Sequence, residues 1–117
     1  MDEPKVKQVI EEAIRLGSET SNVEFKDARG GFPRDTWKTV SAFSHRPGGG
    51  FVVLGVTEDR LKNSMEVTGI IELAVLQEKM SNVVSTQMSV VIRPEYFPMT
   101  LGGKTILVIY IPECSET

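Results

Sequence analysis

The sequence has little cysteine and histidine, since its 117 residues hold one of each, Cys114 and His45. A single cysteine excludes an internal disulfide framework and any cysteine-based zinc cluster. With one histidine and one poorly placed cysteine, no Ser-His-Asp or Cys-His nucleophile system can be assembled. Any chemistry must therefore come from carboxylates, hydroxyls or basic side chains.

Long apolar segments are also missing. No apolar run approaches the ~20 residues that a membrane-spanning helix needs. The first ten residues, MDEPKVKQVI, lack the apolar stretch of a secretory signal. We therefore expect a cytoplasmic location and no membrane partner.

The remaining composition is that of a globular domain, with 40% hydrophobic and 25% charged residues. A chain of this length suffices for one domain with its own core and not comfortably for two. No internal repeat or linker divides it. We expect residues 1–117 to form a single domain, the N-terminal part of a longer protein.

The charge is acidic overall and uneven. The net charge of −3 argues against a basic field over the whole domain. Residues 26–46 nevertheless carry +3, which leaves −6 for the rest of the chain. This local excess predicts phosphate contacts, and its alternative is an ordinary solvated surface. The candidates are Lys26, Arg29, Arg34, Lys38, His45 and Arg46.

Hydrophobic spacing predicts the order α-β-α-β-β-α-β-β and an α+β fold with a mostly antiparallel sheet. Helices are expected between Asp2 and Gly17, over 33–44 and over 71–86, and strands over 22–26, 51–56, 65–69, 88–94 and 104–112.

Three segments carry more specific expectations. In the strand 22–26, Val23 and Phe25 should be core, with Glu24 and Lys26 on a solvated face. The helix 33–44 should bury Trp37, Val40 and Phe43. The segment FVVLGV (51–56) is apolar on both faces, as in a central strand, and the polar loop TEDRLKNS then leads to the hairpin strand 65–69.

The glycines 48–50 do not indicate a phosphate-binding loop. Such loops follow a strand and precede a helix, whereas these glycines follow a helix and precede a strand. A tight helix-to-strand turn is the simpler interpretation.

Acidic residues flank two of the predicted strands. Glu19 and Glu24 surround the start of the first, and Glu58 and Asp59 follow the central one. If these strands are neighbours, the carboxylates can form an oxygen-ligand site for Mg²⁺ or Mn²⁺, able to activate water against a phosphodiester. Removal of Glu24 would then relieve charge repulsion. The alternative is acids in exposed loops.

Three stretches together resemble the Schlafen-type Alba-like domain. They are S-E-x(4)-E-F-K (18–26), TVSAFSHRPGGGFVVLGVTED (39–59) and the terminal VVIRPEYFPMTLGGKTILVIYIPECSET (90–117). The resemblance extends over residues 12–117. Such domains begin bacterial and archaeal transcriptional regulators and RecG-helicase-related proteins, so the resemblance implies a DNA-binding module followed by further domains.

In vertebrate Schlafens, related domains carry a three-carboxylate metal site that cleaves RNA. Carried over by motif, the site residues are Glu19, Glu24 and Glu58, with Asp59 as the alternative third acid. The chain departs from the family pattern at His45, where asparagine is common, and at Thr57, where an acid is common. It also lacks the second lobe of the nuclease groove.

Three hypotheses therefore compete. The first is a nucleic-acid-binding module that contacts DNA or RNA through the basic segment. The second is a metal-dependent ribonuclease. The third is a protein-interaction or dimerisation domain that covers an exposed face with a second copy or a neighbouring domain.

Overall fold

The computed structural model describes residues 2–17, 22–59, 61–62, 64–89 and 91–114. Its helices and strands alternate in the order that the hydrophobic spacing predicts, with one strand more. The elements are α1 (Glu3–Leu16), β1 (Val23–Lys26), α2 (Thr36–Ser44), β2 (Gly50–Leu54), β3 (Val56–Asp59), β4 (Ser64–Val67), α3 (Leu73–Thr86), β5 (Glu95–Leu101) and β6 (Lys104–Ile111).

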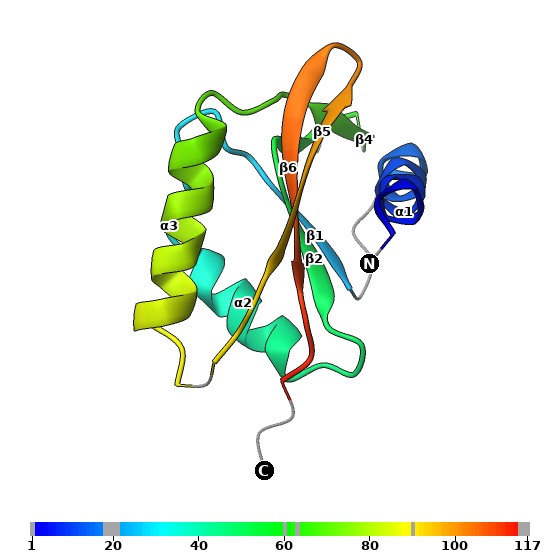
Figure 1. Cartoon of the computed structure of the whole chain (residues 1–117). Helices are drawn as coiled ribbons and strands as arrows, with labels where there is room; N and C mark the ends of the chain where they lie inside the picture. The colour runs from blue at the N-terminus through cyan, green and yellow to red at the C-terminus, as the bar shows by residue number, and fades with distance from the viewer. Residues whose placement is uncertain (1, 18–21, 60, 63, 90, 115–117) are drawn as a thin grey trace.

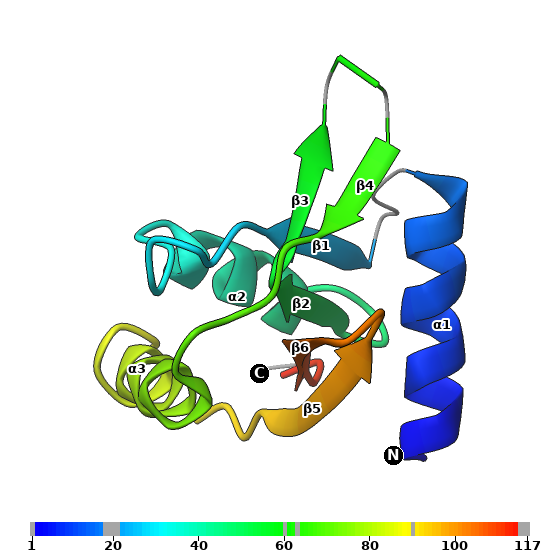
Figure 2. The same cartoon turned by 90° about the horizontal axis from the view of Figure 1, so that it is seen from above.

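A four-stranded sheet of order β1-β2-β6-β5 forms the centre of the domain (Figure 1). β1 and β2 run parallel because α2 connects them as a crossover, and the other neighbours are antiparallel. β3 and β4 form a separate two-stranded hairpin that extends from one end of the sheet (Figure 2). The α+β class with mostly antiparallel pairing is confirmed.

The sheet separates two hydrophobic clusters, with α1 on one face and α2 and α3 on the other (Figure 1). Successive residues of a strand point to opposite faces. In β2, Val53 therefore packs on the α1 side, whereas Val52 and Leu54 pack on the α2–α3 side. All five residues of β2 are buried, which confirms the central strand covered on both faces.

The helix predicted between Asp2 and Gly17 is confirmed. Val6, Ile10 and Ala13 bury one face of α1, and the backbone N–H of Gly17 closes the last turn on the carbonyl of Ile14.

No helix in the described residues is long and apolar enough to cross a membrane.

The predicted polar loop 57–64 is partly a strand. The chain continues past Gly55 into β3, so the hairpin pairs Val56–Asp59 with Ser64–Val67. Thr57 and Thr68 join their hydroxyls across the hairpin at 2.9 Å. Polar residues are compatible with this strand because much of the hairpin is only half-buried or exposed.

The predicted strand 88–94 is wrong, because the strand lies at Glu95–Leu101. β5 is an edge strand and therefore tolerates Pro98, which has no N–H to give to a ladder. Phe97 and Met99 are buried with alternate exposed neighbours, and this alternation is the signal of the true strand.

Two side chains lie differently from expectation. Val40 and Phe43 are buried as predicted, but Trp37 is 42% exposed. Val23 and Phe25 belong to the core, whereas Lys26, expected on a solvated face, is buried. Trp37 belongs to α2, and Lys26 contacts Asp35 at the start of α2.

Candidate nucleic-acid interface

A chain of three hollows follows α3, the first two beside the segment that joins β1 to α2 and the third between α2 and the end of α3. The first and second share Phe32 and Lys79, and the second and third share Gln87. We call this continuous surface the α2–α3 groove. It is made of residues distant in sequence that meet because α2 and α3 cover the same face of the sheet (Figure 1).

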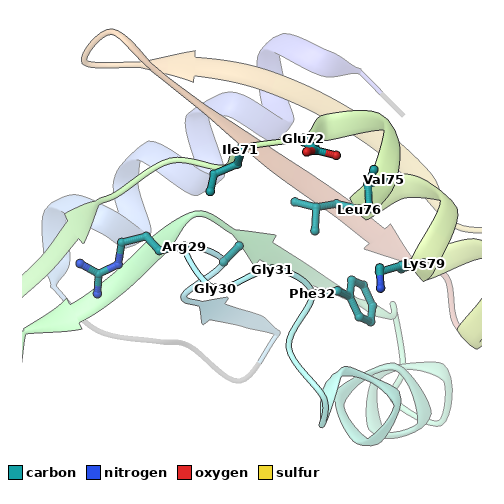
Figure 3. A pocket seen from close by; sticks show the side chains of 10 residues that line it. Arg29, Gly30, Gly31, Phe32, Ile71, Glu72, Val75, Leu76 and Lys79 are labelled. Atoms are coloured by element: carbon teal, nitrogen blue, oxygen red, sulfur yellow. The ribbon is translucent and has the colours of Figure 1, made fainter.

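The first hollow is a cavity of about 430 Å³ between loop 28–32 and the start of α3 (Figure 3). Phe32, Leu76 and Val75 give it apolar walls, and Glu72 and Lys79 supply charge. Phe32 and Lys79 lie together at one end, whereas the guanidinium of Arg29 points away from the centre (Figure 3).

Cationic and aromatic side chains continue along the groove. Arg34 and Lys79 line the second hollow, and both are exposed. Trp37 and His45 line the third. The His45 Nδ1 lies 2.8 Å from the carbonyl oxygen of Ser41, which fixes the ring against α2. The groove thus offers two exposed cations, Arg34 and Lys79, beside the half-buried ring of Phe32 and the exposed ring of Trp37.

Lys26 lies outside the groove, in an ion pair between β1 and the start of α2 in which the lysine is buried and its carboxylate partners are partly exposed. Its ammonium is 3.0 Å from a carboxylate oxygen of both Glu24 and Asp35, and its side chain is 8% exposed. Thr39 of α2 donates to the same oxygen of Glu24 at 2.8 Å. These contacts join β1 to α2, and they occupy the charge that the sequence assigns to phosphate binding.

Burial and hydrogen bonding act on the charge of Lys26 in opposite directions. Burial opposes its charged form, but hydrogen bonds to Asp35 and Glu24 outweigh burial and raise its pKa above the usual lysine value. The hydrogen bond from Lys26 in turn lowers the pKa of Asp35. The pair is charged throughout the neutral range.

Arg29 forms a local ion pair with Asp27. Its Nη2 donates to Asp27 Oδ2 at 2.7 Å, and its backbone N–H donates to Oδ1 at 2.9 Å. These hydrogen bonds lower the pKa of Asp27. Both side chains are partly solvent-exposed, so the pair contributes little to stability. Its hydrogen bonds shape the loop and hold Arg29 away from the hollow.

Lys38 and Arg46 complete the predicted basic set on α2 and the turn that follows it. The Lys38 ammonium lies 5.7 Å from the centre of the Trp37 ring, and the Arg46 guanidinium lies 5.6 Å from that of Phe43. Both contacts have cation–π geometry. They place two further positive charges near the groove without lining it.

The predicted carboxylate cluster is only partly described. Glu19 lies outside the described residues. Glu24 faces α2, since it accepts a hydrogen bond from Thr39. Glu58 is two positions after Val56 and therefore shares the face of β3 that packs on the α1 side. Asp59 accepts from the backbone N–H groups of Leu61 and Lys62. Among the residues that the structure describes, no three His, Cys, Asp or Glu side chains are placed to hold a metal ion.

The glycine turn serves the fold. The Tyr110 hydroxyl donates to the carbonyl of Gly48 at 2.8 Å, and a Glu113 oxygen accepts from the Gly48 N–H at 3.1 Å. A Cβ on Gly49 would lie 2.1 Å from the carbonyl oxygen of Ile111. The glycines therefore let this turn pass against the end of β6.

Sequence reasoning missed Phe32 and Lys79 and placed Trp37 in the core. Lys79 lies 45 positions after Arg34, so a search for basic runs cannot join them. One available signal is that Lys79 lies three residues from the buried Leu76 and next to the buried Met80, beside the apolar stripe of α3.

Comparison with known proteins agrees with this architecture. The N-terminal domain of a RecG-related DNA helicase protein from Nitrosomonas europaea is 27% identical, with a TM-score of 0.75 over 91% of this chain and 71% of that one. The DIP2311 protein from Corynebacterium diphtheriae shares the fold at 18% identity and a TM-score of 0.58, and this chain spans 24% of its length. No curated protein matches the chain.

The sequence also matches a protein family over most of its length. Residues 19–117 match the family described as Schlafen, AlbA_2, which includes β1, the α2–α3 groove and the whole central sheet. This chain is therefore a member of the Schlafen AlbA_2 family.

Proposed function

We propose that the domain binds nucleic acid through the α2–α3 groove. The observation that carries the proposal is the succession of Phe32, Lys79, Arg34 and Trp37 along one continuous hollow surface. Cations at intervals neutralise phosphates, and exposed aromatic rings stack on bases. The family and the RecG-related neighbour support this proposal.

The groove answers the objection that the chain is acidic. A surface needs only a local excess of positive charge to hold a phosphate backbone. Asp35 and Asp27, the two acids of the segment 26–46, are occupied by Lys26 and Arg29. Among the described residues that line the second hollow, Arg34 and Lys79 are accompanied by no acidic side chain.

We further propose that the domain works as the nucleic-acid-binding module of a longer cytoplasmic protein, with transcriptional regulation as its context. The Nitrosomonas europaea neighbour is itself an N-terminal domain. Phosphate contacts give affinity without reading sequence, so further domains would supply any sequence specificity.

The test is a titration of labelled single-stranded RNA, single-stranded DNA and duplex DNA, followed by fluorescence anisotropy at about 50 and about 200 mM salt. We expect binding at low salt that weakens steeply at raised salt. The variants Arg34→Gln and Lys79→Gln should each reduce the slope of log affinity against log salt by about 0.7 to 0.9.

The matched control is Lys7→Gln, an exposed lysine on α1 at the opposite face of the sheet (Figure 1). It removes the same charge and should leave both affinity and slope unchanged. Absence of binding to all three nucleic acids at low salt, or equal losses in Lys7→Gln and Lys79→Gln, would overturn the proposed interface.

A further inference from the structure

We propose that the first hollow of the α2–α3 groove holds one unpaired nucleobase of a single strand whose backbone passes Lys79 and Arg34. The inference rests on the proposed function and narrows it to a substrate class, single-stranded nucleic acid. It also assigns the course of the bound strand, which runs along the groove from the base at loop 28–32 toward Trp37.

The size and walls of the hollow fit a base. Its volume of about 430 Å³ lies within the range of about 300–1,000 Å³ typical of small-ligand sites. Phe32 provides an aromatic ring, and Leu76 and Val75 provide an apolar surface beside it (Figure 3). A planar, uncharged heterocycle is the part of a nucleotide that suits such walls, because every base has a π face.

The polar groups suit the edges of a base. The Glu72 carboxylate lies at the rim and accepts hydrogen bonds, as an exocyclic amino group requires (Figure 3). Gly30 forms part of the opposite wall, and a Cβ placed there would meet nothing within 4 Å. The entrance on that side is therefore open to a ligand.

The cations fix where the backbone lies. Arg29 is bound to Asp27 and its guanidinium points away from the hollow, so it does not compete for the phosphate (Figure 3). Lys79 lines both the first and the second hollow, and Arg34 lines the second. A base in the first hollow thus has its phosphate toward Lys79, and the next phosphate lies toward Arg34.

This arrangement discriminates against duplexes. Bases in a duplex are paired and stacked, and withdrawal of one from the stack has an energetic cost that a single strand avoids. A groove that binds only phosphates has no such preference. Tighter binding of a single strand than of the duplex therefore tests the base pocket independently of the phosphate contacts along the groove.

The experiment uses a single-stranded DNA with one 2-aminopurine, the same strand with an abasic site at that position, and the corresponding duplex. We expect binding of the single strand to change the 2-aminopurine emission. The abasic strand should bind at least about fivefold more weakly, which is the effect expected for loss of one stacked base.

The test variant is Val75→Gln, and Val9→Gln is its matched control. Both valines are on exposed helix surfaces, 38% and 43% exposed, and neither change alters the charge. Val75→Gln should weaken binding of the intact strand and remove the penalty of the abasic site, whereas Val9→Gln should change neither. Circular dichroism of both variants checks that they remain folded.

The outcomes separate the two proposals. If no strand binds at low salt, the proposed function fails. If strands bind with the salt slope that Lys79→Gln reduces, but the abasic strand and the duplex bind as tightly as the intact strand, the base pocket is wrong and the nucleic-acid interface stands. Unchanged 2-aminopurine emission, or an equal effect of Val9→Gln, also overturns the pocket.

Discussion

Nζ of Lys26 lies 3.0 Å from Oε2 of Glu24, two positions earlier on the same face of β1. The Thr39 hydroxyl of α2 donates to that same oxygen. One carboxylate oxygen thus joins a buried ammonium to a helix. This contact gives Glu24 a structural role whose removal has a predictable sign.

Glu24→Gln should destabilise the domain by about 1–2 kcal/mol, because the buried Lys26 loses a charged hydrogen-bond partner while Asp35 remains. A carboxylate cluster built to hold a metal predicts the reverse, since loss of one acid relieves repulsion. The measurement is urea unfolding followed by circular dichroism without added metal.

The control for Glu24→Gln is Glu12→Gln. Glu12 pairs with Arg15 on the exposed surface of α1, with 57% and 67% of the two side chains exposed. Exposed pairs of this kind contribute little, so the unfolding midpoint should not move. A stabilised Glu24→Gln protein would contradict the ion-pair role and favour the metal hypothesis.

The ion pairs also predict the pH dependence of stability. The pKa of Asp35 is lowered by Lys26, and that of Asp27 is lowered by Arg29. Their contributions are fully present above the unfolded carboxyl pKa of about 3.9 and are lost as the pH falls through the lower folded values. For Lys26, burial opposes the charge but hydrogen bonds to Asp35 and Glu24 raise the pKa. Its contribution is therefore present below about 10.4 and lost as the pH rises further.

The urea midpoint of the parent protein should decrease as the pH is lowered from about 7 to about 2. The midpoint of Asp35→Asn should decrease less steeply over the same range, because this variant lacks the carboxylate that Lys26 holds ionised. The difference should be small because 64% of the Asp35 side chain is exposed. Identical acid profiles for Asp35→Asn and the parent would show that Lys26 does not hold Asp35 ionised.

Alanine substitutions at Gly48 and Gly49 distinguish the cost of a steric clash from the cost of backbone strain. Both have positive φ, +70° and +81°. A Cβ on Gly49 would lie 2.1 Å from the Ile111 carbonyl oxygen, whereas one on Gly48 would meet nothing within 4 Å. Gly48→Ala should cost about 1–2 kcal/mol from the left-handed conformation alone.

Gly49→Ala adds displacement of the β6 end to the same strain, so its cost should exceed that of Gly48→Ala by about 2 kcal/mol or more. Thermal or urea unfolding of the two variants provides the comparison. Equal costs would mean that the turn and β6 do not meet as closely as this structure shows.

Most of the fold could be predicted because its signals are local. Val6, Ile10 and Ala13 recur at helical spacing, and FVVLGV is apolar on both faces. β5 could not be placed correctly because Val91 and Ile92 are apolar but lie before the strand, and Pro98 argues against the strand that contains it. Only the position of β5 at the sheet edge resolves this conflict.

The candidate site was less accessible to sequence reasoning. A count of charge finds Arg34 and Lys26 together, but the fold buries Lys26 against two carboxylates and leaves Arg34 beside Lys79. Whether a lysine is paired or available depends on which strand and helix meet. The neighbourhood of Lys79 and Phe32 is a tertiary property that no local spacing contains.

Trp37 gives the last prediction, because it is the only tryptophan and lies in the third hollow at 42% exposure. Lys38, 5.7 Å from the ring centre, supplies a charge near the place where a stacked base would have its phosphate. Binding of a single strand should quench Trp37 fluorescence and protect it from acrylamide. Trp37→Ala should weaken binding by about 1–3 kcal/mol, the range measured for base–aromatic stacking, and Trp37→Phe should retain most of the affinity.

If the strand binds only through phosphate contacts away from Trp37, the result is the contrary. Trp37 emission then stays constant while anisotropy rises, and Trp37→Ala binds as tightly as the parent protein. That result would move the nucleic acid off the end of the α2–α3 groove that includes Trp37 and confine it to Lys79 and Arg34.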